Sequence, residues 1–233
     1  CGVDGSCFRD AVRKCLDDID DTVAFVDKVI EGVRADEVEL RASKSMSLAD
    51  VMLTGKNTDS EILVDPIPNV YFTRDTFSVI GGGVSVNHMR FATRRRESLL
   101  GTYLFRYHPE YADVPLWYDR GLPYHIEGGD ILVLGPTVVG IGISERTQPA
   151  AIDCIARQLL WSERHSGVER VFAFSIPHKR SFMHLDTVFT QVDVDTFTVH
   201  PGILGTLRVF ELTRGRSEGE VSIKQMDGSL DVI

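Results

Sequence analysis

An internal repeat is the feature that most constrains the fold of this chain. Asp75, Asp130 and Asp186 each stand at the entrance to a β-branched or aromatic run typical of a strand, and they are spaced 55 and 56 positions apart. A turn and a second strand-like run follow in each case. A fixed spacing of this size is typical of repeated supersecondary units such as those of propellers. In a radial arrangement of such units the three aspartates would converge on the axis, where a small site can form.

The composition of the chain limits which partners and which cellular setting are expected. The chain of 233 residues has 25 Lys and Arg against 34 Asp and Glu, a formal net charge of −9. A duplex nucleic-acid binder needs positive charge to displace counterions, so no nucleic-acid partner is expected. The sequence has no run of 18 apolar residues, so no membrane partner is expected either. Four cysteines are too sparse for a disulfide scaffold, which indicates a cytoplasmic protein.

The chain divides at residues 65–69, Asp-Pro-Ile-Pro-Asn, where two prolines exclude a helix. Before this boundary, apolar residues recur at steps of three or four over residues 8–35, which predicts an amphipathic helix. A second, short helix is expected over 47–54. These signals predict part of a helical domain over residues 1–65.

Residues 66–233 have a different texture, with short β-branched and aromatic runs separated by Gly and Pro turns. A glycine triplet at 81–83 is expected to be a hairpin turn, because it lacks the Lys-Ser/Thr that follows in a phosphate-binding loop. Helices are expected over 92–106 and 147–164. The segment is therefore predicted to be an α/β domain of about three units, each with a hairpin, a helix and a further strand.

Acidic residues gather at the repeat positions. In Glu127–Asp130, two glycines between two acids let the backbone bend tightly, so that a ligand can approach; the alternative is a plain polar turn. In His184–Asp186, the histidine and the acid would share one face of a strand, while Leu185 points into the core. Such a pair can transfer protons, although a structural histidine is the alternative.

Several carboxylates near one point repel each other unless a cation is present. A planar guanidinium satisfies two carboxylates by paired hydrogen bonds. A divalent metal is the rival cation, but it would want more oxygen or histidine ligands than this set offers, so no metal is expected. Two basic segments remain: Arg94–Glu97 stands at the start of an expected helix, and Ser144–Thr147 follows a strand-like run. They are solvated faces or ion pairs unless one arginine of each binds a carboxylate.

Taken together, these segments resemble the arginine deiminase family. The resemblance rests on Asn69–Asp75 (Asn-Val-Tyr-Phe-Thr-Arg-Asp), the two basic segments, Glu127–Asp130 and Met183–Phe189, in the family's order over about residues 66–203. It implies a pentein fold, an α/β propeller of ββαβ modules, with about three modules here and part of the family's helical domain. It also implies hydrolysis of L-arginine to L-citrulline and ammonia without a cofactor.

The resemblance implies a role for each of eight residues. They are the guanidinium ligands Asp75 and Asp186, the acid/base pair Glu127 and His184, the α-carboxylate ligands Arg94 and Arg146, and the positioning residues Asn69 and Phe72. Asp130 is expected to be structural and to support the turn beside Glu127.

The nucleophile is where the sequence departs from the family. The family attacks with a cysteine thiolate from a Gly/Arg-rich loop near its C-terminus and forms a covalent amidino-thioether. No such loop precedes Ile233, and Cys154 lies in an expected amphipathic helix as a buried, inert thiol. We therefore expect a central fragment that starts at Cys1, is inactive alone, and associates with itself or with its missing modules through exposed strand edges.

Two other function classes stay open. One is a non-catalytic propeller module that binds arginine or serves as a structural piece. The other is a different guanidine-modifying enzyme, such as an agmatine deiminase, a dimethylarginine hydrolase or an amidinotransferase. Arg94 and Arg146 favour an amino-acid substrate, because agmatine has no carboxylate for them to bind.

Overall fold

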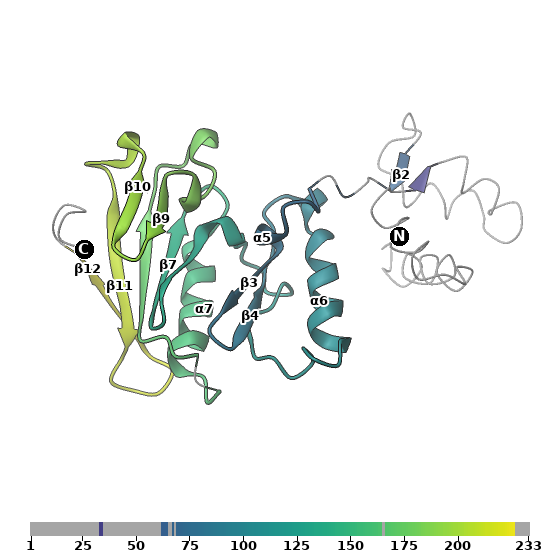
Figure 1. Ribbon diagram of the computed structural model, residues 1–233, viewed down its shortest axis with the longest axis horizontal. Coiled ribbons are helices and arrows are strands. Elements are labelled where there is room, and N and C mark those ends of the chain that lie inside the picture. The colour runs from purple at the N-terminus through teal and green to yellow at the C-terminus, as the bar shows by residue number, and fades with distance from the viewer. Residues whose placement is uncertain (1–32, 35–61, 65–66, 68, 165, 227–233) are drawn as a thin grey trace, which may run out of the picture. The chain divides into compact units, whose positions relative to one another are not determined.

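The computed structural model describes residues 33–34, 62–64, 67, 69–164 and 166–226, and the chain forms two compact units, Cys1–Val70 and Tyr71–Ile233 (Figure 1). In the first unit, strand β1 (Val33–Arg34) pairs antiparallel with β2 (Ile62–Val64). The helix predicted over 8–35 therefore does not reach its expected end, because strand pairing overrides the helical period there. The rest of that helix, and the one expected over 47–54, lie outside the described residues.

The second unit begins with a strand–strand–helix–strand segment. Its elements are α5 (Thr73–Thr76), β3 (Phe77–Ile80), β4 (Gly83–Val86), η1 (Ala92–Arg94), α6 (Glu97–Tyr107) and β5 (Leu116–Tyr118). Strands β3 and β4 pair antiparallel, and β5 pairs parallel with β4. The hairpin turn between β3 and β4 is confirmed: Gly81 takes a φ of 55°, which glycine adopts at no steric cost.

A second segment repeats this connectivity. Its elements are η2 (Gly128–Asp130), β6 (Ile131–Gly135), β7 (Val138–Ile143), α7 (Pro149–Trp161) and β8 (Arg170–Ser175). Strands β6 and β7 are antiparallel, and β7 and β8 are parallel. The two helices expected in the domain are thus found as α6 and α7. Strand β5 was not predicted, because three residues are too few to show alternation.

The third segment differs from the other two. Its elements are η3 (Arg180–Phe182), η4 (Leu185–Thr187), β9 (Phe189–Asp193), β10 (Thr196–Val199), η5 (Pro201–Ile203), β11 (Arg208–Arg214) and β12 (Val221–Gln225). The prediction of a helix in every unit is wrong here. Only η5 stands between the β9–β10 hairpin and β11, because Pro201 and the positive φ of Gly205 interrupt the chain. Strand β11 joins β8, which gives a five-stranded sheet of order β12-β11-β8-β7-β6.

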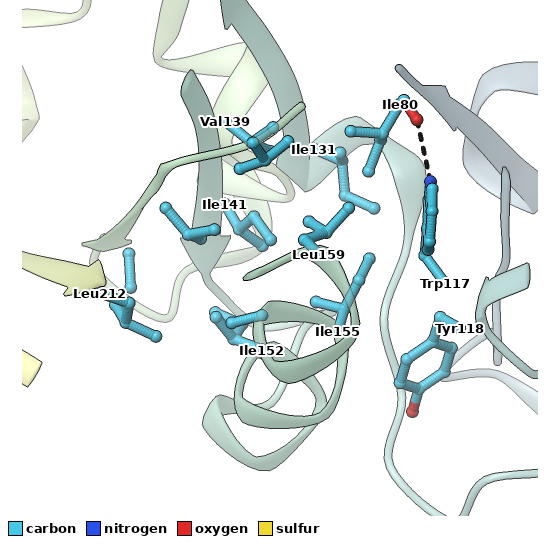
Figure 2. Close-up of a cluster of buried hydrophobic side chains, with 14 of the residues drawn as sticks. Ile80, Trp117, Tyr118, Ile131, Val139, Ile141, Ile152, Ile155, Leu159 and Leu212 are labelled. Carbon is cyan, nitrogen blue, oxygen red and sulfur yellow. Dashed lines mark hydrogen bonds between the residues drawn. The ribbon is translucent and has the colours of Figure 1, made fainter. Parts of the chain in front are cut away.

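Helix α7 carries the main hydrophobic core (Figure 2). Its buried Ile152, Ile155 and Leu159 follow the predicted helical spacing and share one core with side chains of both sheets. The indole N–H of Trp117 in β5 donates to the carbonyl of Ile80 at 2.8 Å, which satisfies the one polar atom of this large side chain. Each fully buried aliphatic side chain here contributes about 1.5–3 kcal/mol.

The other face of the five-stranded sheet is covered by the β9–β10 hairpin and the turns before it. Successive residues of β8 alternate between the two cores, with Phe172 and Phe174 on the hairpin side. The ring of Phe174 stacks on Phe189 of β9 with centroids 5.2 Å apart. Leu185 is fully buried in this core, as predicted. The packing therefore fixes the turn that carries His184 and Asp186.

Among the helices of the described residues, none is long and apolar enough to cross a membrane.

Candidate active site

The three repeat aspartates lie in three short helical turns, each of which ends immediately before a strand or one residue ahead of it. Asp75 is in α5, Asp130 in η2 and Asp186 in η4. Turn α5 contacts η2, and η2 contacts η4. The prediction that His184 and Asp186 share a strand face is wrong, because Thr187 donates to the His184 carbonyl at 2.6 Å and closes a turn before β9 begins.

Glu127 and His184 form a buried hydrogen-bonded pair. Nε2 of His184 lies 2.8 Å from Oε2 of Glu127, and the two side chains are 5% and 0% exposed. Burial acts to raise the pKa of Glu127, but His184, the Arg90 amide and Arg146 outweigh it, so this pKa lies below its ordinary value. Burial acts to lower the pKa of His184, but Glu127 and nearby aspartates outweigh it and raise this pKa. The pair therefore favours a carboxylate beside an imidazolium.

Three further groups hold Glu127 in place. Its Oε1 accepts the backbone N–H of Arg90 at 3.0 Å, and its Oε2 lies 3.3 Å from Nη1 of Arg146. Its own backbone N–H donates to the hydroxyl of Thr147 at 3.2 Å. The contribution of Arg90 was missed in the sequence, because a backbone N–H has no signature in residue type.

Two glycines make room for this pair. A side chain at Gly129 would lie 2.6 Å from Cγ of His184, and one at Gly128 would lie 2.7 Å from the hydroxyl of Ser78 and overlap the Arg74 carbonyl. The Gly128-Gly129 pair thus lets the neighbouring turns α5 and η4 approach η2 closely.

Asp75 and Arg94 form a second buried cluster with Glu97. Nη1 of Arg94 lies 2.9 Å from Oδ2 of Asp75, and Nε and Nη2 both bind the Glu97 carboxylate at 2.9–3.2 Å. Burial acts to lower the pKa of Arg94, but Glu97 and Asp75 outweigh it and raise this pKa. No role was predicted for Glu97 from the sequence. Its position three residues after Arg94 at the start of a helix is nevertheless a signal for an ion pair between the two side chains.

Asp75 and Asp186 lie close enough to repel each other. Oδ1 of Asp75 is 4.0 Å from Nδ1 of His184, and Oδ2 of Asp186 is 3.6 Å from Nε of Arg74. Burial raises the pKa of Asp186, and the Asp75 carboxylate adds to the rise, whereas His184 and Arg74 oppose it. Two carboxylates in this relation favour a cation between them. The described residues include no group of three or more His, Cys, Asp or Glu side chains that could hold a metal ion.

Arg146 approaches Glu127 from the loop between β7 and α7. Its guanidinium lies over the ring of Phe91 at 4.5 Å, and Nη2 is 3.2 Å from Sδ of Met183. Its Nε is buried and has no hydrogen-bond partner among the described residues. The hydroxyl of Ser144 accepts the N–H groups of Arg146 and Thr147 at 2.9 and 3.1 Å and so closes the loop.

The structure brings together six of the eight predicted site residues, which are Asp75, Arg94, Glu127, Arg146, His184 and Asp186. Phe72 stands at the start of α5 with 55% of its surface exposed, in edge contact with Tyr71. Asn69 belongs to the first unit, and its role stays a prediction.

Cys154 does not belong to this cluster. It lies on α7, partly buried against the main core, and burial raises the pKa of its thiol. Cys1, Cys7 and Cys15 lie outside the described residues. The described part of the site therefore contains no thiol.

An α/β domain whose loops gather carboxylates, arginines and one buried histidine has the make-up of a site for a small polar ligand. The arginine deiminase family model matches residues 5–232, and the chain belongs to this family.

Curated relatives agree with this assignment. The arginine deiminase of Treponema denticola is 48% identical over 227 residues, which is 97% of this chain and 54% of that protein. The arginine deiminase of Clostridium perfringens is 44% identical over 215 residues, 91% of this chain and 50% of that protein. The chain thus spans about half the length of the curated relatives it matches.

Solved structures show a more distant likeness. AgrE in its binary complex with L-arginine has a TM-score of 0.47 at 22% identity, over 59% of this chain and 19% of that chain. The DDAH of Pseudomonas aeruginosa in complex with citrulline has a TM-score of 0.43 at 20% identity, over 57% of this chain and 47% of that chain.

Proposed function

We propose that this chain is the part of an arginine deiminase that binds the guanidinium group and moves protons in the hydrolysis of L-arginine to L-citrulline and ammonia. Membership of the family and relatives named arginine deiminase support the activity. The observation that carries the proposal is the buried pair of Glu127 and His184 beside the carboxylates of Asp75 and Asp186.

Asp75 and Asp186 are the proposed guanidinium ligands. A guanidinium has five N–H donors in one plane, so two carboxylates can bind two of its edges at once. Such binding holds the positive charge in place and keeps the central carbon electrophilic. It also relieves the repulsion that raises the pKa of Asp186.

Glu127 and His184 are the proposed acid/base pair. In the family's reaction a cysteine thiolate adds to the guanidinium carbon, ammonia leaves, and water then displaces the thiolate to give citrulline. The imidazolium of His184 can give its proton to the departing nitrogen, and the neutral imidazole can take one from the attacking water. The Glu127 carboxylate stabilises the charged form of the ring, as the raised pKa of His184 indicates. The thiolate would be supplied by a cysteine outside this 233-residue chain.

Arg94 and Arg146 are the proposed ligands of the substrate α-carboxylate, and Asn69 and Phe72 would help to position the rest of the substrate. Both guanidinium groups already touch site acids, but each terminal nitrogen has a second N–H. The unpartnered Nε of Arg146 is a further donor. These donors favour L-arginine over agmatine, which lacks the carboxylate.

We also infer the wider architecture and setting. The two strand–strand–helix–strand segments support a pentein propeller with residues 66–233 as modules, and residues 1–65 would form part of a helical domain. The protein would act in the cytoplasm, and exposed strand edges would lead to association with further modules or with a second copy.

The test is citrulline release from L-arginine by the 233-residue chain and by the complete product of its gene. We expect release by the complete product and none by the chain alone, with agmatine a poor substrate. The variant His184→Asn should abolish release, whereas His178→Asn, an exposed histidine, should not. A complete product that is inert on arginine would contradict the proposed activity, and turnover by the short chain would contradict the external thiolate.

A further inference from the structure

Asp130 is the repeat aspartate with no proposed contact to substrate, and it is also the most deeply buried. It is fully buried, whereas the side chains of Asp75 and Asp186 are 14% and 27% exposed. Burial raises the pKa of Asp130 to about 7, although His184 and three hydrogen-bond donors oppose the rise. A buried acid is costly unless its oxygens are satisfied, so the identity of its partners shows what it does.

One oxygen of Asp130 anchors the loop that presents Arg146. Its Oδ2 accepts the hydroxyls of Ser144 and Thr147, each at 2.6 Å. The same Ser144 oxygen accepts the N–H of Arg146 at 2.9 Å. The hydroxyl of Thr147 also accepts the backbone N–H of Glu127 at 3.2 Å.

The other oxygen of Asp130 anchors the turn that presents His184. Its Oδ1 accepts the N–H of Leu185 at 2.8 Å, the residue between His184 and Asp186. Strand β7 leaves space for this contact at Gly142, where a side chain would overlap Oδ1 of Asp130 and lie 2.9 Å from Cβ of Leu185. A single carboxylate thus joins two loops that are far apart in the sequence.

We propose that Asp130 is a positioning residue that locks the Arg146 loop to the His184 turn, so that carboxylate binding and proton transfer act on one substrate in one geometry. This role rests on the proposed function. It differs from simple support of the fold, because loss of the link should misalign two functional groups in molecules that are still folded. A displacement of about 1 Å at such a site costs up to about a hundredfold in rate.

The test uses the complete gene product with Asp130→Asn, Ser144→Ala and the control Ser166→Ala. Asp130→Asn keeps the shape of the side chain but replaces one carboxylate oxygen, which accepts hydrogen bonds, with an NH2 group. This group is a donor and would face the donors that Asp130 binds. Ser144→Ala removes one of the two hydroxyl links to the Arg146 loop and leaves the Leu185 link intact. Ser166 is a buried serine that bridges the Leu159 carbonyl and the Val168 N–H, away from the site.

We expect Ser144→Ala to raise KM for L-arginine about tenfold or more, with a smaller change in kcat. Asp130→Asn should raise KM and lower kcat, each by about tenfold or more, and should lower the NMR titration midpoint of His184, because Asp130 helps to raise that pKa. Ser166→Ala should change only the melting temperature. If Asp130→Asn does not fold, the proposal is tested by the KM and kcat of Ser144→Ala.

Unchanged kinetics and an unchanged His184 midpoint in folded Asp130→Asn and Ser144→Ala would overturn the proposal, since a merely structural role predicts a loss of stability only. A wild-type protein that releases no citrulline would instead contradict the proposed function. The link would then be tested without turnover by the crystal structure of Asp130→Asn, where displaced positions of the Arg146 loop and the His184 turn are expected and unmoved positions would overturn the proposal.

Discussion

The two strand–strand–helix–strand segments of the second unit share their order but use equivalent positions differently. Each has an aspartate in the turn before its first strand, Asp75 or Asp130, and an arginine between its second strand and its helix, Arg94 or Arg146. In the first segment the aspartate binds the arginine directly, at 2.9 Å. In the second segment Asp130 accepts hydrogen bonds from hydroxyl groups of the loop that carries Arg146, and the ion pair with Arg146 is made by Glu127 instead.

The two helices show the same division. Helix α7 buries six apolar residues between the two sheets, whereas the buried residues of α6 are Glu97, Ser98 and Gly101. Glu97 faces Arg94, so the start of α6 belongs to the site rather than to the core. Equivalent positions of the two segments can therefore have different roles. One aspartate can carry a charge that acts in the site, whereas the other can hold a loop that carries such a charge, and the polar groups of the neighbouring loop determine which role it has.

The largest expected effect concerns Asp75, which is less buried than Asp130, the equivalent aspartate of the second segment. Asp75→Ala should lower kcat/KM for L-arginine by about 10²–10³-fold, because an oriented charge that faces the proposed guanidinium is lost. The rate of citrulline release by the complete gene product measures this. The control Asp153→Ala removes an exposed acid paired with Arg157 and should change the rate less than twofold. A loss below tenfold in Asp75→Ala would argue against guanidinium binding.

For the free energy of unfolding, the larger loss is expected at Asp130 and the smaller one at Asp75. Asp130→Ala leaves two buried hydroxyls and the Leu185 N–H without their acceptor, which should lower the free energy of unfolding by about 3 kcal/mol or more. Asp75→Ala should cost less than about 1 kcal/mol, because Glu97 still binds Arg94. Urea denaturation of both variants makes the comparison, and equal losses would show that the two positions are not used differently.

A smaller effect is expected at the glycines of the second segment. Gly129→Ala brings a methyl group against the ring of His184 and should cost about 1–3 kcal/mol as well as activity. Gly135→Ala meets nothing within 4 Å and should change stability by no more than about 0.5 kcal/mol. Thermal unfolding separates the two, and a neutral Gly129→Ala would mean that His184 does not occupy this space.

The smallest expected effect is in pH dependence. The NMR titration midpoint of His184 should lie above 6.5 and fall in Glu127→Gln, whereas that of His125, whose pKa is lowered by burial, should lie below 6.5. The raised pKa of His184 stabilises the fold fully below pH 6.5, and this contribution is lost as pH rises through the raised value. The lowered pKa of Glu127 stabilises the fold above pH 4.5, and this contribution is lost as pH falls through the lowered value. A His184 midpoint below 6.5 would contradict the pairing.

Much of the fold could be predicted, because strands and helices leave periodic signals. The hairpin at Gly81 and the buried face of α7 followed directly from spacing. The strand assignment of His184 failed because a local hydroxyl bond from Thr187 closes a turn, which alternation cannot foresee. The helix expected after β10 failed because Pro201 and its neighbours outweigh the repeat.

The acid and arginine positions of the site could also be predicted, because the repeat and the family motifs mark them. The supporting contacts could not. The Arg90 amide acts through backbone, and the hydroxyl of Ser144 meets Asp130 only because β6 and β7 pair and bring both ends together. Contacts of this kind form because the fold brings distant residues together, so they cannot be predicted from residue type alone.

The central claim is that Asp75 and Asp186 bind the substrate guanidinium while Asp130 holds the loops around them. A crystal structure of the complete gene product with L-arginine, in the slowed variant Glu127→Gln, tests it most directly. We predict guanidinium nitrogens within about 2.7–3.2 Å of the Asp75 and Asp186 carboxylates, and Asp130 still bound to Ser144, Thr147 and Leu185 without touching the ligand. A guanidinium bound elsewhere, or one in contact with Asp130, would contradict the account.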